Sequence, residues 1–470
     1  MNSLGISMVI LLGLIVQLAA QDKHLLTMSV LSGWQFQCMN TTCLPLTATT
    51  TLDVRKCQVA CLNEIQCQAA SFHRSSLNCQ LFNNISNQNT NMSIDVNTIS
   101  MITVSGMRTL QISTTTSTLS TLTTTTACNI MFVSQPTYST GLVPYSMAVL
   151  DVNNDDKPDM IVANYNSNNV GVRLNLGNGT FLAEIFYSVG VYPRSVTVVD
   201  VNLDNLPDIV VANYNSNNVG VLLNTGNGTF LSQTTYSVGT NPFSVVVADV
   251  NADNKPDIIV ANYNSNNVGV LINIGNGTFF NQTVYTVGSQ PIAIEVIDVD
   301  NDNKLDIIVG NSNSSNVGVL LNMGNGTFLN QITYPIGTYV ISIAVGDLNN
   351  DNKSDIIAIN SNSNNISILL NAGNGTFLSQ ITRSVGAYPR SVAIGDVNCD
   401  NKPDLIVANA AVNNVGIYLN AGNGIFQNET NYLVGDTPTQ VMLIDVNNDN
   451  KLDIIVANAG SNEISVLLRN

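Results

Sequence analysis

Apolar and polar residues alternate in short blocks along residues 128–470, and the same order of blocks returns every 49 residues. One period holds four apolar segments rich in β-branched residues: SVTVVDV (195–201), DIVVANY (208–214), NVGVLLN (218–224) and TFLSQTTYSVG (229–239). Clusters of Asn, Gly and Asp separate them, which is typical of short strands joined by turns. Gly-Asn-Gly between the third and fourth segments suits a tight hairpin, because Asn and Gly tolerate positive φ. The pattern predicts four strands in each repeat and no helix.

The acidic segment that opens each period sets the predicted architecture. It begins seven times, at Asp151, Asp200, Asp249, Asp298, Asp347, Asp396 and Asp445. Four strands in a repeat of this length are typical of a propeller blade, so we expect an all-β fold, a seven-bladed β-propeller over residues 128–470. A solenoid of stacked repeats is the alternative, but it needs atypical capping repeats, and none is evident.

The ends of the repeat region predict how the ring closes. Phe132 lies one 49-residue period before Phe181, and the sequence stops at Asn470, short of a seventh hairpin. We therefore expect residues near 132–140 to supply the fourth strand of the blade whose first three strands are C-terminal. Such a closure removes free strand edges.

The region before the repeats has a different composition. An apolar run over residues 6–20, ending in small residues, is shorter than the ~20 residues of a membrane span. It predicts a signal peptide at 1–20 and a secreted, extracellular protein. Residues 109–127 are rich in Ser and Thr, which predicts a flexible linker. Between them, at 24–108, we expect a small disulfide-rich α+β module, because six of the eight cysteines gather there: Cys38, Cys43, Cys57, Cys61, Cys67 and Cys79.

The other two cysteines are Cys128, just before the first propeller strand, and Cys399, in the sixth acidic segment. The predicted strand order puts both on one rim, so we expect a Cys128–Cys399 disulfide; unpaired or intermolecular thiols are the alternative. Sequons would accept N-glycans outside the cell, although turn geometry alone explains most of the repeated Asn-Gly-Thr. Examples begin at Asn40, Asn84, Asn91, Asn178, Asn227, Asn276, Asn325 and Asn374.

The acidic segments have the composition of a site for a hard cation. The net charge is −16, and 23 of the 32 acidic residues fall in these seven nine-residue segments. Positions 1, 3, 5 and 9 carry only oxygen ligands, which favours Ca²⁺, as many as seven ions in a structural role, with a backbone carbonyl near position 7 adding a ligand. Position 6 is Asp or Asn, which suits a left-handed turn. Carboxylates that only cap turns, without metal, are the alternative.

The candidate ligands at positions 1, 3, 5 and 9 are Asp151, Asn153, Asp155, Asp159, Asp200, Asn202, Asp204, Asp208, Asp249, Asn251, Asp253, Asp257, Asp298, Asp300, Asp302, Asp306, Asp347, Asn349, Asp351, Asp355, Asp396, Asn398, Asp400, Asp404, Asp445, Asn447, Asp449 and Asp453.

Two families resemble parts of this chain. The pattern D-x-N-x-D-x-x-x-D, an apolar strand, N-x-N-S-N-N-V-G-V-L-L-N and G-N-G-T-F resembles the FG-GAP/VCBS repeats, which include the integrin α-subunit propeller. That resemblance implies a propeller with calcium loops on one rim, and does not extend to integrin ligands. The segment CQVACLNEIQCQAASFHRSSLNCQLF (57–82) resembles a PAN/apple domain, a module that binds proteins or glycans.

The loops that join one repeat to the next suggest a ligand face opposite the acidic rim. They vary where the strands do not, and they carry Tyr and Arg, which often anchor interfaces. The candidates are Tyr145, Tyr192, Arg194, Phe243, Tyr339, Tyr388 and Arg390. Tyr165, Tyr214 and Tyr263 would reach the same face. The alternative is that these rings only pack between blades.

The sequence favours binding over catalysis. Its two histidines, His24 and His73, lie outside the repeats, so the commonest general base is missing from the propeller. We expect adhesion or recognition of an extracellular protein or glycan, with no enzymatic activity, nucleic-acid partner or membrane span. A secreted enzyme acting on carbohydrate or lipid, with the propeller as an accessory, and a structural matrix protein remain the alternatives.

Overall fold

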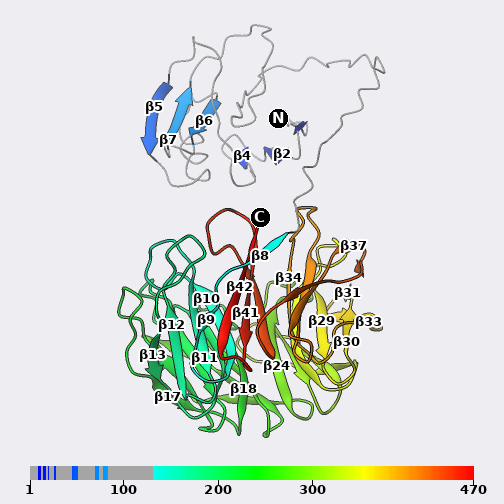
Figure 1. Cartoon of the computed structure of the whole chain (residues 1–470). Helices are drawn as coiled ribbons and strands as arrows, with labels where there is room; N and C mark the ends of the chain where they lie inside the picture. The colour runs from blue at the N-terminus through cyan, green and yellow to red at the C-terminus, as the bar shows by residue number, and fades with distance from the viewer. Residues whose placement is uncertain are drawn as a thin grey trace. The chain divides into compact units, whose positions relative to one another are not determined.

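Seven antiparallel sheets, six of four strands and one of five, make up the blades of the repeat region in the computed structural model (Figure 1). The structure describes residues 131–470 and, within residues 1–130, only the backbone of short strands. Neighbouring sheets touch through their first strands, and β10 contacts both β14 and β40, so the sheets form a closed ring with the first strands innermost. The prediction of a seven-bladed, all-β propeller is confirmed, and the described residues contain no helix.

The strands have nearly the same bounds in every blade. The innermost strands are β10 (Pro144–Leu150), β14 (Pro193–Val199), β18 (Pro242–Ala248), β24 (Pro291–Ile297), β28 (Val340–Gly346), β34 (Pro389–Gly395) and β40 (Pro438–Ile444). The second strands are β11 (Asp159–Asn164), β15 (Asp208–Asn213), β19 (Asp257–Asn262), β25 (Asp306–Asn311), β29 (Asp355–Asn360), β35 (Asp404–Asn409) and β41 (Asp453–Asn458).

The third strands are β12 (Asn169–Arg173), β16 (Asn218–Leu222), β20 (Asn267–Leu271), β26 (Asn316–Leu320), β30 (Asn365–Leu369), β36 (Asn414–Tyr418) and β42 (Glu463–Arg469). The outermost strands are β13 (Ile185–Ser188), β17 (Thr234–Ser237), β23 (Thr283–Thr286), β27 (Ile332–Pro335), β33 (Ile381–Ser384), β39 (Thr430–Leu433) and, in the last blade, β8 (Phe132–Ser134) with β9 (Tyr138–Ser139).

The fourth strand is shorter than the sequence predicts. In the second blade, β17 covers only Thr234–Ser237 of the predicted 229–239. Phe230 instead forms a bridge with Asn224, and its ring is buried against the neighbouring blade. The Gly-Asn-Gly hairpin thus folds back and places Phe230 in the hydrophobic cluster between blades one and two. In three blades it forms a two-stranded ribbon: β21 (Asn273–Gly275) with β22 (Thr278–Phe279), β31 (Asn371–Gly373) with β32 (Thr376–Phe377), and β37 (Asn420–Gly422) with β38 (Ile425–Phe426).

The ring closes between the two ends of the repeat region. β42 pairs antiparallel with β8, with Leu467 opposite Ser134 and Arg469 opposite Phe132, and also with β9. In Figure 1 the first propeller strand, in cyan, lies beside the last, in red. The predicted closure by residues near 132–140 is therefore confirmed, and it leaves no blade with an unpaired third strand.

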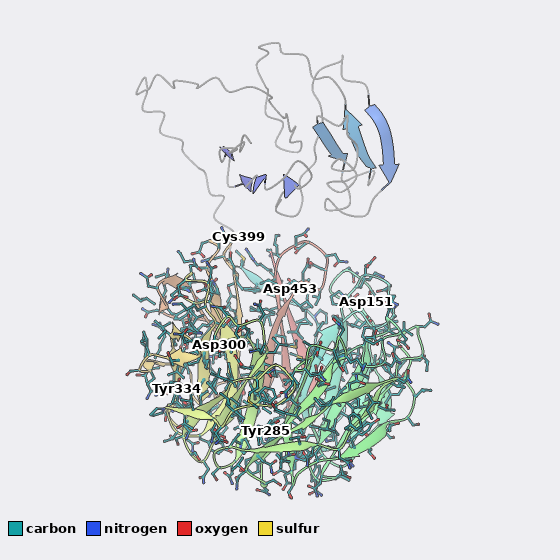
Figure 2. The ribbon with its side chains drawn as sticks, turned by 180° about the vertical axis from the view of Figure 1, so that it is seen from behind. Asp151, Tyr285, Asp300, Tyr334, Cys399 and Asp453 are labelled. Carbon is teal, nitrogen blue, oxygen red and sulfur yellow. The ribbon has the colours of Figure 1, made fainter. Side chains whose placement is uncertain are left out.

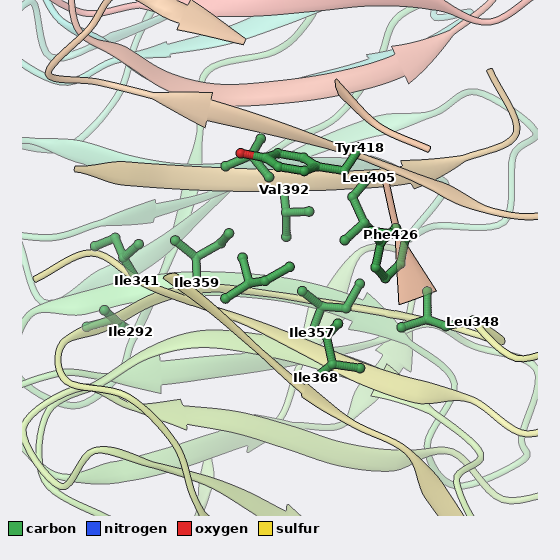
Figure 3. Close-up of a cluster of buried hydrophobic side chains, with 12 residues drawn as sticks. Ile292, Ile341, Leu348, Ile357, Ile359, Ile368, Val392, Leu405, Tyr418 and Phe426 are labelled. Carbon is green, nitrogen blue, oxygen red and sulfur yellow. The ribbon is translucent and has the colours of Figure 1, made fainter. Parts of the chain in front are cut away.

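The hydrophobic core lies between blades rather than within one sheet. Every second strand is buried along its whole length, because a sheet in the ring is covered on both faces. Alternate residues of β11 face opposite neighbours: Ile161 packs against blade two and Met160 against the last blade. Figure 3 shows one such cluster, where Ile357 and Ile359 of β29 meet Leu405 of β35. Seven clusters of this kind hold the ring together.

The chain divides into two units, 1–121 and 122–470. In the first, β5 (Pro45–Thr50), β7 (Asn78–Phe82) and β6 (Ala69–His73) form an antiparallel sheet in the order β5-β7-β6. Two short pairs precede it, β1 (Val9–Leu11) with β2 (Leu14–Val16), and β3 (Ala19–Ala20) with β4 (Leu26–Thr27). Within the predicted signal peptide the structure describes only the backbone of β1, β2 and β3, which does not test that prediction. The pairing of the N-terminal cysteines and the linker lie outside the described residues.

Candidate metal rim and channel mouth

The seven acidic segments form loops between the first and second strands of each blade, so they share one rim. Figure 2 labels Asp151, Asp300 and Asp453 in three of them. Each loop turns twice through the left-handed region, at position 4 (φ 59–64°) and at position 6 (φ 60–65°). The predicted left-handed turn at position 6 is confirmed, and Asn or Asp there limits its steric cost.

Side-chain oxygens hold each loop in shape by accepting backbone N–H groups. In the first loop, Asp151 Oδ1 accepts from Asp155 N at 3.2 Å, and Asp151 Oδ2 accepts from Asp156 N at 2.7 Å. Asn153 Oδ1 also accepts from Asp155 N, at 3.1 Å. The oxygens at positions 1 and 3 therefore point inward over the turn, as a cation site requires.

The aspartate at position 9 is the most buried member of each loop. Asp159 is fully buried; its Oδ2 accepts from Val152 N at 3.0 Å, and its Oδ1 accepts from Asn175 N at 2.7 Å. Burial raises the pKa of Asp159 to about 6, against the opposing effect of these two N–H groups. The six equivalent aspartates have their pKa raised to about 6 for the same reason: Asp208, Asp257, Asp306, Asp355, Asp404 and Asp453. A buried carboxylate of this kind is stabilised by a bound cation.

In the fourth loop three carboxylates converge. Oxygens of Asp298, Asp300 and Asp306, at positions 1, 3 and 9, lie within 4.8 Å of one another. The other loops carry Asn at position 3, which offers an amide oxygen in place of a carboxylate. A donor set made only of oxygens fits Ca²⁺, and these three positions could hold it.

Position 5 faces a lysine instead. Lys304 Nζ lies 2.6 Å from Asp302 Oδ2, and a lysine at position 7 makes the same pair in five other loops. The second loop has Leu206 at that position, and Asn202 Nδ2 donates to Asp204 Oδ2 at 3.0 Å. In the fourth loop the structure thus brings positions 1, 3 and 9 together, while in six of the seven loops position 5 pairs with a lysine of the same loop.

A further asparagine, present in six of the seven repeats and not singled out by the sequence pattern, links neighbouring loops. Asn224, after the third strand of blade two, donates from its backbone N to Asp208 Oδ1 at 2.8 Å. Its Nδ2 donates at 2.9 Å to the carbonyl of Val152, in the loop of blade one. Asn175 closes the circle by donating to Val446 of the last blade. Its recurrence two residues after the third strand in six of the seven repeats was the available signal.

The last blade replaces that asparagine with Arg469. Its backbone N donates to Asp453 Oδ1 at 2.8 Å, and its guanidinium lies 2.8 Å from Cys399 Sγ in the loop of the preceding blade. Cys399 forms a disulfide. It is the only cysteine in residues 131–470, so its partner lies outside that range. The predicted partner, Cys128, lies outside the described residues, and the pairing itself stays a prediction.

The opposite rim carries the innermost strands' first residues, and here each blade has a β-bulge. The register shifts between Pro193 and Ser195, for example, so Arg194 is the extra residue. The equivalent shifts put one residue from every blade on this ring: Tyr145, Arg194, Phe243, Ile292, Ile341, Arg390 and Thr439. Bulges redirect side chains, and we call these seven the bulge ring.

The bulge ring lines a central cavity of about 170 Å³. Below it, the cavity wall continues with Ser146, Ser195, Ser244, Ser342 and Ser391, and Glu295 of β24 reaches the same space. Burial raises the pKa of Glu295 to about 7. Four of the predicted ligand-face residues, Tyr145, Arg194, Phe243 and Arg390, are therefore in the channel wall.

The other three predicted ligand-face residues are Tyr192, Tyr339 and Tyr388, which lie on the rim outside the channel, 36–37% exposed. Tyr192 stacks on Tyr165, with ring centroids 4.6 Å apart and an interplanar angle of 8°. Phe243 contacts both Tyr214 and Tyr263. The prediction that the tyrosines after the second strands reach this face is thus confirmed.

Two arginines of the bulge ring meet at one hydroxyl. Arg194 Nη2 donates to Tyr145 Oη at 2.6 Å, and Arg390 Nη1 donates to the same oxygen at 3.1 Å. The guanidinium of Arg194 lies between aromatic rings, with its Cζ 3.9 Å from the Tyr145 centroid and 3.8 Å from that of Phe243. These cation–π contacts fix the orientation of the guanidinium.

Fold and loops together define the class: a seven-bladed β-propeller with acidic loops on one rim and a bulged channel mouth on the other. The model described as an FG-GAP-like repeat matches residues 151–211, 200–260, 249–309, 298–358, 347–407 and 396–456. The chain therefore belongs to the FG-GAP-like repeat family. Residues 37–105 match the PAN domain. Both domains are typical of extracellular proteins.

Solved structures show similarity of fold alone. Virginiamycin B lyase from Staphylococcus aureus superposes with a TM-score of 0.52 at 15% identity, covering 72% of this chain and 99% of that one. BBS1N in complex with ARL6DN gives a TM-score of 0.52 at 10% identity, covering 72% and 97%. No curated protein matches the chain. Among the described residues, no helix is long and apolar enough to cross a membrane.

Proposed function

We propose that this protein is a secreted, calcium-binding recognition protein, in which the propeller presents the channel mouth to an extracellular protein or glycan. The observation that carries the proposal is the bulge ring, where one residue differs from blade to blade on an otherwise repeated scaffold. A rigid ring with variable, directed side chains is a suitable binding surface. The match to a PAN domain adds a second module of an extracellular type.

Calcium is proposed as the structural ion of the acidic rim. The oxygens at positions 1, 3 and 9 converge in the fourth loop, and buried carboxylates without a cation partner recur in every repeat. When bound, the ion would neutralise these carboxylates and fix the loops. The role we propose for it is structural, and the role of the whole chain is binding rather than catalysis.

The proposal is tested with the full chain, produced by secretion and labelled at one end. Its binding to surfaces coated with extracellular-matrix protein and glycan fractions is measured in calcium and again after chelation. We expect saturable binding that chelation abolishes, because the loops hold the blades that carry the channel mouth. Tyr388→Ala, which changes the exposed rim beside the channel mouth, is compared with the parent chain in the same binding assay. Binding that rises linearly with protein concentration on every surface would contradict specific recognition.

A further inference from the structure

We propose that the channel mouth binds an acidic sugar, with its carboxylate on Arg194 and Arg390 and its hydroxyls on the serines and Glu295 below. This inference rests on the proposed recognition function and names the chemistry of the ligand. It depends on four features of the channel wall: the two guanidiniums, their lack of a carboxylate partner, the serine hydroxyls, and the single acid deeper in the cavity.

The two arginines are specific to this chain's second and sixth blades. The other five positions of the bulge ring hold Tyr145, Phe243, Ile292, Ile341 and Thr439. Both arginines donate to Tyr145 Oη, which places two positive charges at one point of the channel wall. Like charges held this close repel each other, and an anion between them removes the repulsion.

Neither guanidinium has a carboxylate partner among the described residues. The ion pairs of that part of the chain involve six loop lysines and Arg173. The Nε atoms of Arg194 and Arg390 are buried without a hydrogen-bond acceptor, as are those of the other three arginines in residues 131–470. An arginine offers its donors as a planar fork that matches a carboxylate. In a chain of net charge −16, two cations left unpaired in a cavity indicate an anionic ligand.

The serines below the arginines provide donors for hydroxyl groups. Ser146 Oγ accepts from Val196 N, and Ser195 Oγ accepts from Val245 N, each at 3.2 Å. Ser391 Oγ accepts from Val441 N in the same way. A hydroxyl that accepts from a backbone N–H can still donate its own hydrogen, so these three serines can donate to a ligand.

Glu295 distinguishes a sugar from a bare anion. Its carboxyl lines the same cavity, and no described residue forms an ion pair with it. It would repel a second acidic group, yet it accepts hydrogen bonds from ligand hydroxyls. The cavity, about 170 Å³, is below the ~300–1,000 Å³ of sites that enclose drug-sized ligands. One ring with one carboxylate and several hydroxyls satisfies all of these constraints.

The experiment is calorimetric titration of the full chain, in calcium, with glucuronate. Glucose is the uncharged match, and acetate is the bare carboxylate. We expect glucuronate to bind at least about tenfold more tightly than either, because only glucuronate engages both the arginines and the hydroxyl partners. Acetate binding as tight as glucuronate would overturn the sugar assignment, and no saturable glucuronate binding would overturn the site.

Variants locate the binding. Arg390→Gln should weaken the binding of glucuronate by about tenfold or more, since it removes one of the two guanidiniums that bind the carboxylate. Arg390→Lys keeps the positive charge but loses the planar fork of donors. Its affinity for glucuronate should lie between that of the parent chain and that of Arg390→Gln. Arg383→Gln is the matched control, because Arg383 lies on outermost strand β33 and donates to the carbonyl of Phe426. Melting curves confirm that each variant is folded. Equal affinity in Arg390→Gln would contradict the proposal.

The two proposals fail in different ways. If Arg390→Gln still binds matrix surfaces saturably while no variant or parent binds glucuronate, recognition stands and the acidic-sugar site is wrong. If matrix binding is absent altogether but glucuronate binds and depends on Arg390, the site stands and the recognition of matrix components is wrong.

Discussion

The two rims of the propeller differ in how strictly residue types recur from blade to blade. On the acidic rim, positions 1, 5 and 9 are aspartate in all seven loops, and the same hydrogen bonds return in each. On the bulge ring, seven equivalent positions hold five residue types. The first rim is determined by the needs of a turn with buried carboxylates, which admit few residues. The second is held by the backbone bulge, so its side chains can change without changing the fold.

Removing calcium should have the largest effect on stability, and this effect should come from the acidic rim. We expect the full chain to melt more than about 10 °C lower in excess chelator, because each filled site adds about 2.7 kcal/mol when free calcium is 100-fold above Kd. Differential scanning calorimetry with a count of bound metal measures this. An unchanged melting temperature and no bound metal would reduce the acidic loops to simple turns.

A single change at position 9 should be the next largest effect. In Asp257→Asn, an amide NH₂ must face one of the two backbone N–H groups that Asp257 accepts, from Val250 and Asn273. We expect a loss of about 2–4 kcal/mol, measured by denaturant unfolding in calcium, because the variant also removes a charged ligand from the proposed metal site. Asp253→Asn, at exposed position 5 of the same loop, is the control and should lose less than about 1 kcal/mol. Equal losses would show that burial at position 9 is unimportant.

The acidic rim should also respond to pH when calcium is absent. The position-9 aspartates have a folded pKa of about 6, above their ordinary value of 3.8. The folded state therefore binds more protons between these values, so stability is highest below pH 4 with respect to these groups and is lost as pH rises through 6. We expect the melting temperature in chelator to be several degrees higher at pH 5 than at pH 7.5.

Calcium competes with those protons, so saturating calcium should remove or reverse that trend. The same pair of pH values, measured with and without chelator, provides the comparison. A melting temperature in chelator that rises from pH 5 to pH 7.5 would contradict the raised pKa of these aspartates.

Between the rims, blade one departs from the repeat. Variants there test whether the residues of blade two would give a more stable fold. Arg173 and Glu184 are buried 3.6 Å apart where blade two has Leu222 and Gln233. Arg173 Nε and Glu184 Oε2 lack hydrogen-bond partners. We expect the double variant Arg173→Leu with Glu184→Gln to be more stable by about 1–2 kcal/mol in urea unfolding. Each single variant should be destabilised, since it leaves one partner alone.

The smallest effect should come from the exposed part of the channel rim. Tyr388→Ala removes a ring that is 37% exposed, and we expect the free energy of unfolding to change by less than about 1 kcal/mol. Urea unfolding of the full chain in calcium measures it. A loss as large as that of Asp257→Asn would mean that this rim is as constrained as the acidic one.

Repetition explains how much of the fold the sequence predicted. The 49-residue period predicted seven blades, and the position of Phe132 predicted which segment completes the last one. The fourth strand was predicted too long. Thr229 is β-branched and Phe230 is apolar, as strand residues often are, but they belong to the hairpin that precedes β17, and Phe230 is buried there. Pattern alone does not distinguish a strand residue from a buried turn residue.

The site was predicted by residue type and only partly by arrangement. Spacing indicated oxygen ligands at positions 1, 3, 5 and 9, but the pairing of Asp302 with Lys304 depends on a side-chain rotamer that spacing does not define. The contact of Arg194 and Arg390 at one tyrosine hydroxyl joins blades two and six across a ring. Such a contact needs the closed ring and the bulge register, which a repeat pattern does not reveal.

The pairing of β42 with β8 has a consequence for the order of events during synthesis. A ribosome releases Phe132–Ser134 long before Glu463–Arg469, and adds roughly 5–20 residues each second. The earliest propeller strand must therefore wait, without its partner, until Glu463–Arg469 has left the exit tunnel. Six blades can stack in turn as they emerge, but the circle is completed only after β42, the last strand of the ring, has emerged.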